Sequence, residues 1–386
     1  MKKIYLCLAA FFISGVLLAA CGKNADLMNR IDDREKNETN EKASKETNGQ
    51  DIQSLETIHF PREYKNVIKN VTFDTVLVIP ENLEQSQLKK STAIVQMPDA
   101  TKAIELFASG KKVLESDKNK GTGDNGTTYD TLYNTYEDGS AIYVDTNFGY
   151  STPFEDKIRT VFRLDGELEP TESQFSKDKN FAFLNAEQAF FKIRESMNHI
   201  GYELSDCSYD YYALEHQVLE KQTLQKDDFK ETETSKWNDQ DDSYYFFGEQ
   251  MHQGIPVYYG MRDFPQDDEN QRPIQAIYSA NGIEMLRLNA LYRFQTGEEA
   301  VSLSDFETIA TNVANKYGNL LTSAAYQVKR AKLYQIPVKS ATGEYEVKIG
   351  WFLEIEESGF DKEMNTDYVF TLYTFVDAQT GEEIIL

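Results

Sequence analysis

The sequence has 386 residues and a formal net charge of −24, from 40 lysines and arginines against 64 aspartates and glutamates. Such an acidic chain does not suit binding to nucleic acid or to a bare anionic lipid surface, both of which attract basic proteins. Its 23 phenylalanines and 23 tyrosines favour folded domains rich in β-strands, and the length leaves room for two or three domains.

The N-terminal segment has the organisation of an export signal. Lys2 and Lys3 precede an apolar stretch, residues 4–18, which is shorter than a typical transmembrane helix. The order Leu18-Ala19-Ala20-Cys21 follows and resembles the lipobox of bacterial lipoproteins. The resemblance implies that residues 1–20 are a signal peptide and that a diacylglyceryl lipid on Cys21 anchors the chain in the cell membrane, at its extracytoplasmic face. An ordinary secretory peptide, cleaved by chance before a cysteine, is the alternative.

Polar residues dominate residues 21–55, which cannot bury enough apolar surface to fold and are predicted to be a flexible tether. No later segment reaches the length of a membrane span. Since Cys7 leaves with the signal peptide and Cys21 carries lipid, Cys207 remains alone and an intramolecular disulfide framework is excluded. We interpret Cys207 as a small, half-buried side chain, with a nucleophile as the alternative.

The next region, residues 56–180, is predicted to be an N-terminal domain of strand, helix and antiparallel meander. Alternating apolar residues indicate a strand within residues 70–80, and Asp99 follows Pro98 where a helix should begin. The meander is expected to have a loop at residues 121–126, strands at 129–136 and 141–148 joined by an Asp138-Gly139 turn, and a last strand at 157–164.

Two later segments repeat one helix design. Asn185 with Gln188, and Ser304 with Glu307, have the spacing of a capping box at a helix N-terminus. Apolar residues then recur at helical spacing in both segments. The helices are expected to end at Gly201 and Gly318 respectively.

Strand-like stretches follow each helix and finish in a short hairpin, with turns at Asn281-Gly282 and Thr380-Gly381. The predicted fold class is therefore α+β, with amphipathic helices packed on antiparallel sheets. We expect two related modules, residues 181–299 and 300–386, after the N-terminal domain.

The last module resembles PepSY-type domains and the extracytoplasmic regulators of sensor kinases that share their layout. The resemblance is carried by Trp351-Phe352-Leu353 in a strand after the helix and by Val376-Asp377-Ala378-Gln379-Thr380-Gly381-Glu382 near the chain end. It covers about the last quarter of the chain and implies interaction or inhibition more than catalysis. It supplies no catalytic residue.

No pattern in the sequence indicates a metal, cofactor or catalytic site. The four histidines, His59, His199, His216 and His252, belong to no metal-binding motif, and neither a nucleophile elbow nor a phosphate-binding loop is present. Two acidic runs are interpreted as solvated loops, with calcium sites as the alternative; they contain Asp239, Asp241 and Asp242, and Asp267, Asp268 and Glu269.

We therefore expect a non-catalytic lipoprotein that binds an envelope protein or peptide, with no nucleic acid as partner, and modulates signalling or proteolysis. An exposed sheet edge would suit strand addition by the partner. Trp237, Tyr258 and Tyr259 are candidate contact residues, with core packing as the alternative for the tyrosines. The alternative functions are a solute-binding lipoprotein of a transporter and a cell-wall-directed hydrolase.

Overall fold

The computed structural model describes residues 60–81, 83–122, 126, 128–159, 161, 174–204, 206–224, 236–259, 272–320, 324–340 and 343–386. Every described residue lies in one compact unit, Ser54–Leu386. These residues form five α-helices and 17 strands in two antiparallel-rich sheets, which confirms the predicted α+β class. Within this part of the chain, no helix has the length and apolar character needed to cross a membrane.

The first sheet combines strands from both ends of the described chain. Its members are β1 (Glu63–Ile68), β2 (Val71–Val78), β3 (Lys89–Val95), β13 (Tyr292–Ala300), β14 (Ala325–Lys339), β15 (Tyr345–Asp361), β16 (Thr366–Asp377) and β17 (Glu383–Ile384). The strand order is β1-β2-β14-β15-β16-β17, and β3 pairs with both β15 and β13. Only β2 and β14 are parallel; the other pairs in this sheet are antiparallel.

The second sheet is formed by the middle of the chain. Its members are β4 (Val113–Thr122), β5 (Thr128–Tyr136), β6 (Ala141–Val144), β7 (Phe148–Ser151), β8 (Asp206–Leu214), β9 (Ser243–His252), β10 (Ile255–Pro256), β11 (Ile274–Ser279) and β12 (Gly282–Leu288). The order is β10-β9-β11-β12-β7-β6-β5-β4, and β8 also pairs with β9. The predicted turns at Asp138-Gly139 and Asn281-Gly282 join β5 to β6 and β11 to β12, as expected. The predicted loop at residues 121–126 is partly strand, because β4 continues to Thr122.

The helices are α1 (Ala100–Ala108), α2 (Pro153–Arg159), α3 (Ala186–His199), α4 (His216–Leu224) and α5 (Phe306–Tyr317). Asp99 caps α1, since its carboxylate accepts hydrogen bonds from the backbone N–H groups of Thr101 and Lys102. Asn185 and Gln188 form the predicted capping box of α3. Gly201 has a φ of 103°, a left-handed conformation that glycine adopts without strain.

The start of α5 differs from the prediction by one position, whereas the helix ends at Gly318 as predicted. Asp305 is the N-cap, and its carboxylate accepts from the backbone N–H of Thr308 at 2.8 Å. Ser304 instead donates its hydroxyl proton to the carbonyl of Gln379. Gly318 has a φ of −70°, so the helix ends without a left-handed residue.

The strand predicted at residues 157–164 is wrong in its described part, because residues 153–159 form α2. Pro153 begins this helix, where its fixed φ is favourable and its missing N–H costs nothing. Glu155 at the first turn and Arg159 at the last suit the helix dipole and form an ion pair of 2.8 Å.

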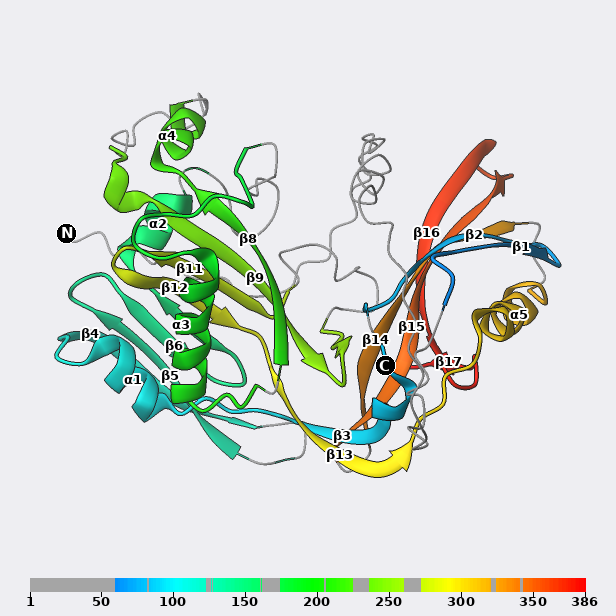
Figure 1. The fold of residues 1–386 in the computed structure, drawn as a ribbon, viewed down its shortest axis with the longest axis horizontal. Coiled ribbons are helices and arrows are strands. Elements are labelled where there is room, and N and C mark those ends of the chain that lie inside the picture. The colour runs from blue at the N-terminus through cyan, green and yellow to red at the C-terminus, as the bar shows by residue number, and fades with distance from the viewer. Residues whose placement is uncertain are drawn as a thin grey trace, which may run out of the picture. The chain divides into compact units, whose positions relative to one another are not determined.

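The predicted repeat is present in the topology. α3 is followed by β8, β9, β11 and β12, and α5 by β14 to β17, and within each set consecutive strands pair antiparallel. Figure 1 shows α3 against the second sheet and α5 beside the first. The apolar face of each helix is buried in the core of its own sheet, with Phe190 and Ile193 in one and Ile309 and Val313 in the other.

The described residues within 56–180 do not form a sheet of their own. Strands β1, β2 and β3 belong to the first sheet, whereas β4 to β7 belong to the second. The long ribbon of β3 and β13 connects the two sheets, as Figure 1 shows. The predicted N-terminal domain is thus divided, because the edges of β14 and β12 accept strands β2 and β7 from it.

Candidate binding surface

The hairpin of β15 and β16 extends beyond the strands beside it. β14 pairs with β15 only as far as Ser358, so residues 359–368 form a two-stranded tip. The Asp361 carboxylate closes the turn by accepting hydrogen bonds from the backbone N–H groups of Glu363 and Met364. A two-stranded hairpin is only marginally stable alone in water, so the tip depends on the sheet beneath it. We call residues 354–370 the hairpin surface.

The hairpin surface exposes large apolar side chains on both of its faces. Phe360 is 51% exposed and Val369 61%, and the strand register places both on one face. Phe370 is 59% exposed and lies on the opposite face with Tyr368, whose ring centroid is 5.1 Å away. Met364 in the turn is 73% exposed. Exposed apolar side chains of this size, gathered at one end of a sheet, are typical of a contact site for another molecule.

The outer edge of β16 is open along most of its length. β17 pairs only with Phe375 and Val376, and among the described residues no strand pairs with the rest of this edge. β16 carries no lysine or arginine. The edge strand of the second sheet, β4, differs because it carries Lys118 and Lys120, charges that discourage pairing with another chain. The β16 edge has no comparable protection.

The hairpin surface is acidic. It contains one lysine, Lys362, and six acidic residues, so its formal charge is 1 − 6 = −5; the acidic residues are Glu354, Glu356, Glu357, Asp361, Glu363 and Asp367. Tyr368 donates to the Glu357 carboxylate at 3.1 Å, and desolvation together with this hydrogen bond raises the pKa of Tyr368. A ligand of this surface should therefore combine apolar and cationic groups.

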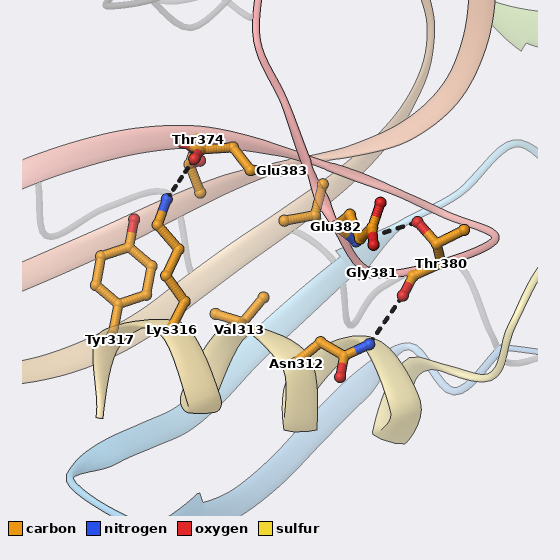
Figure 2. A pocket seen from close by; sticks show the side chains of 10 residues that line it. Asn312, Val313, Lys316, Tyr317, Thr374, Thr380, Gly381, Glu382 and Glu383 are labelled. Atoms are coloured by element: carbon orange, nitrogen blue, oxygen red, sulfur yellow. Dashed lines mark hydrogen bonds and ion pairs between the residues drawn. The ribbon is translucent and has the colours of Figure 1, made fainter. Parts of the chain in front are cut away.

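A pocket of about 370 Å³ lies between α5 and the closing hairpin of β16 and β17 (Figure 2). The Asn312 amide donates to the Thr380 carbonyl at 2.8 Å, and Lys316 forms a 2.8 Å ion pair with Glu383. A Cβ at Gly381 would lie 2.6 Å from the Asn312 amide nitrogen, so the turn approaches the helix closely. These contacts fasten the Thr380-Gly381 turn to α5.

A second pocket, of about 480 Å³, occupies the equivalent place in the preceding module. Lys192 and Ser196 line it from α3, seven and eleven residues after the N-cap, as Asn312 and Lys316 do in α5. The Asn281-Gly282 turn closes it. The two modules therefore share a pocket between helix and closing turn as well as their topology.

Of the three predicted contact residues, Trp237 and Tyr258 are buried and Tyr259 is half-buried. Trp237 is 7% exposed, with the Lys157 ammonium 4.5 Å from its ring centroid. Tyr258 is 4% exposed and packs edge-on against Phe375 at 4.7 Å. The Tyr259 hydroxyl bonds to Gln250, and burial raises its pKa well above the usual value. The burial of Trp237 and Tyr258 favours core packing over contact with a partner, whereas Tyr259 stays a candidate.

The other singled-out polar residues have partners within the protein. His216 bonds to the Asp242 carboxylate, and His252 lies 2.9 Å from the Ser91 hydroxyl. Lys157 pairs with Asp241 at 2.6 Å, so the first acidic run is engaged by protein cations and donors. Within the described residues, no group of three or more histidine, cysteine or acidic side chains could hold a metal ion.

Cys207 is partly buried, and burial raises the pKa of its thiol, in agreement with the predicted half-buried side chain. His199 is the last residue of α3, at the end favoured for a cation. Cys21, His59, the tether and the second acidic run, Asp267, Asp268 and Glu269, lie outside the described residues.

Comparison with known proteins gives a fold but no family. No family of known proteins matches the chain, and no curated protein does. An uncharacterized protein from Eubacterium rectale ATCC 33656 superposes with a TM-score of 0.53 at 17% identity, covering 84% of this chain and 94% of its own. The C-terminal domain of Bacillus megaterium YpeB reaches a TM-score of 0.24 at 11% identity, covering 73% and 92%. The first likeness shows a shared fold, and the second is too low to support an argument.

Proposed function

We propose that this chain is a non-catalytic, lipid-anchored binding protein of the cell envelope, which contacts another envelope protein or a peptide and modulates signalling or proteolysis. The observation that carries the proposal is the hairpin surface, where Phe360, Val369 and Phe370 are each more than half exposed beside an open strand edge. Leaving so much apolar surface in water is unfavourable, and a partner that covers it removes this cost.

The sequence supports the anchor. Leu18-Ala19-Ala20-Cys21 fits a lipobox, and residues 21–55 supply a polar tether between lipid and folded region. A lipid anchor restricts the protein to the membrane surface and raises its effective concentration toward membrane partners.

The closing hairpin supports the resemblance to PepSY-type modules. In that resemblance the strands that flank the Thr380-Gly381 turn pack on the helix of the module, and here Asn312 and Lys316 of α5 contact Thr380 and Glu383 of this hairpin. Modules of this group bind or inhibit other proteins more often than they catalyse. The resemblance and the hairpin surface thus both favour a role in binding another protein.

Site-specific photocrosslinking tests the proposal in the cells from which the chain comes. A photoreactive phenylalanine analogue, p-benzoylphenylalanine, replaces Phe370 in the full lipidated chain. The matched control carries the analogue at Phe191 of α3, a phenylalanine that is 58% exposed against 59% for Phe370. We expect one discrete adduct from position 370 and none from position 191. Equal labelling at the two positions, or no adduct at either, would contradict the proposal.

A further inference from the structure

We infer that the partner contributes an extended segment, which adds to the first sheet as a new strand along the outer edge of β16, from Asp367 to Tyr373. The segment carries apolar residues at its centre and lysine or arginine at its ends. This inference rests on the proposed function and specifies how the partner is held.

Backbone hydrogen bonds at the end of β16 fix which residues face the open edge. The Asp377 N–H donates to Glu382 on the β17 side, whereas the Ala378 N–H donates to Ile349 on the β15 side. Successive residues of a strand direct their N–H and C=O groups to opposite edges. The register of β15 with β16 runs without a shift from Gly350–Asp377 to Asp361–Thr366, so this alternation holds along the strand.

The odd-numbered residues of β16 therefore direct their backbone groups away from β15. Phe375 is covered by β17, which leaves four residues with outward N–H and C=O groups: Asp367, Val369, Thr371 and Tyr373. They present a regular row of donors and acceptors about 20 Å long, which a strand of about seven residues would match. Pairing of this kind supplies main-chain hydrogen bonds without requiring a pocket.

The side chains beside this row indicate the centre of the added strand. Val369 lies on one face of the sheet and Phe370 on the other, each about three-fifths exposed. A neighbouring strand places its own side chains next to both, since its residues alternate in the same way. Apolar residues at two or more consecutive positions of the added strand would cover both faces at once.

The charge of the hairpin surface indicates the ends of the added strand and disfavours a second copy of this chain. The surface carries a net −5, with Asp361, Glu363 and Asp367 at its exposed tip. Two such hairpins paired edge to edge would bring these like charges together, which destabilises strand pairing. A segment with lysine or arginine on either side of its apolar centre would instead be attracted.

Thr371→Pro is the substitution that tests strand addition. Proline removes the outward N–H and places its ring on the open edge, but this residue makes no ladder bond to β15. Thr371→Val, the matched control, keeps the N–H and nearly the same shape. Both variants are made in the full lipidated chain with the photoreactive group at position 370.

We expect Thr371→Pro to lower the yield of the adduct by about tenfold and Thr371→Val to leave it within about twofold. Equal yields in both variants would overturn strand addition while leaving the proposed function intact. Absence of the adduct in the unsubstituted chain would refute the proposed function itself. An adduct that proves to be a second copy of this chain would overturn the choice of partner.

Folding and charge are checked in the same system. The unfolding temperatures of the purified variants should differ by only a few degrees. If Thr371→Pro unfolds, Asp367→Pro with Asp367→Asn as control repeats the test nearer the tip.

The peptide Lys-Lys-Val-Ile-Thr-Phe-Val-Thr-Lys-Lys should compete with adduct formation, and its counterpart with glutamates at the ends should not. Equal competition by both peptides would overturn the basic character of the segment.

Discussion

Protonation of His252 should destabilise the folded protein as the pH falls below neutrality. His252 is 6% exposed, its ring is stacked on Phe294 at 4.1 Å, and its Nε2 lies 2.9 Å from the Ser91 hydroxyl. These contacts join β9 of the second sheet to β3 and β13 of the first sheet. Burial lowers the pKa of His252 from 6.5 to about 4.

The sign of the effect follows from the two pKa values. The unfolded chain binds a proton at His252 near pH 6.5, whereas the folded chain does so only near pH 4, so acid favours unfolding. The stability that neutral His252 contributes is fully present above the pKa of this residue in the unfolded chain. It is lost as the pH falls toward the pKa of His252 in the folded chain. The linkage relation gives a loss of about 2 kcal/mol between about pH 7 and pH 5, rising to about 3 kcal/mol near pH 4.

Urea unfolding at several pH values, with intact protein and His252→Gln compared, measures this loss. Carboxylates titrate in the same range, but they are common to both proteins, so the difference between the two free energies of unfolding isolates the histidine. We expect that difference to change by about 2 kcal/mol between about pH 7 and pH 5. A difference that does not vary with pH would refute the argument that a neutral, buried imidazole is part of the junction.

Three further changes have defined outcomes. Cys21→Ser should move the protein from the membrane fraction to the soluble fraction, and retention in the membrane would contradict the lipid anchor. Lys332→Met should lower the free energy of unfolding by about 3 kcal/mol because it leaves the buried Glu249 carboxylate, 3.7 Å away, without this cation. Addition of Glu249→Gln in the same chain should recover part of that loss. If urea unfolding instead shows that the losses from the two substitutions add, Lys332 and Glu249 are not coupled. Phe370→Ala should weaken partner binding by about 3 kcal/mol, about a hundredfold in Kd, because the exposed ring would be buried in the complex. Phe191→Ala should leave the same titration unchanged, and a similar loss from both would argue against the hairpin surface.

Local signals in the sequence predicted the repeated parts of the fold well. Asn185 and Gln188 define the start of α3 because a capping box depends on residues three apart, and the Asn281-Gly282 turn is equally local. The same reasoning chose Ser304 over Asp305, since both residue types cap helices. In the structure, Asp305 has the backbone geometry of the N-cap, and the Ser304 hydroxyl instead bonds to Gln379. Neither feature can be read from the spacing of residues in the sequence.

The division of residues 56–180 between two sheets could not be read from local patterns. Strand β2 pairs in parallel with β14, with Val71 opposite Tyr326, and nothing in either segment alone specifies that partner. The short helix α2 could not be predicted from the sequence either, because the apolar residues Ile158 and Val161 suit a strand equally well.

The candidate site was missed for a related reason. Phe370 and Val369 have the composition of any half-buried strand, and they lie where β17 no longer covers the outer edge of β16, which local spacing does not reveal. Trp237, chosen because it lies in a polar segment, is instead covered by Lys157 and an apolar cluster. Burial of single side chains depends on these long-range contacts, whereas helix caps and turns do not.

The photocrosslink at position 370 is the decisive measurement for the binding role of the hairpin surface. We expect a single partner protein, captured from Phe370 and not from the equally exposed Phe191, in cells that carry the full lipidated chain. Identification of the crosslinked partner peptide by mass spectrometry should return an apolar segment with basic flanks. Capture of the same protein from both positions, or of none from position 370, would show that the hairpin surface is not the binding site.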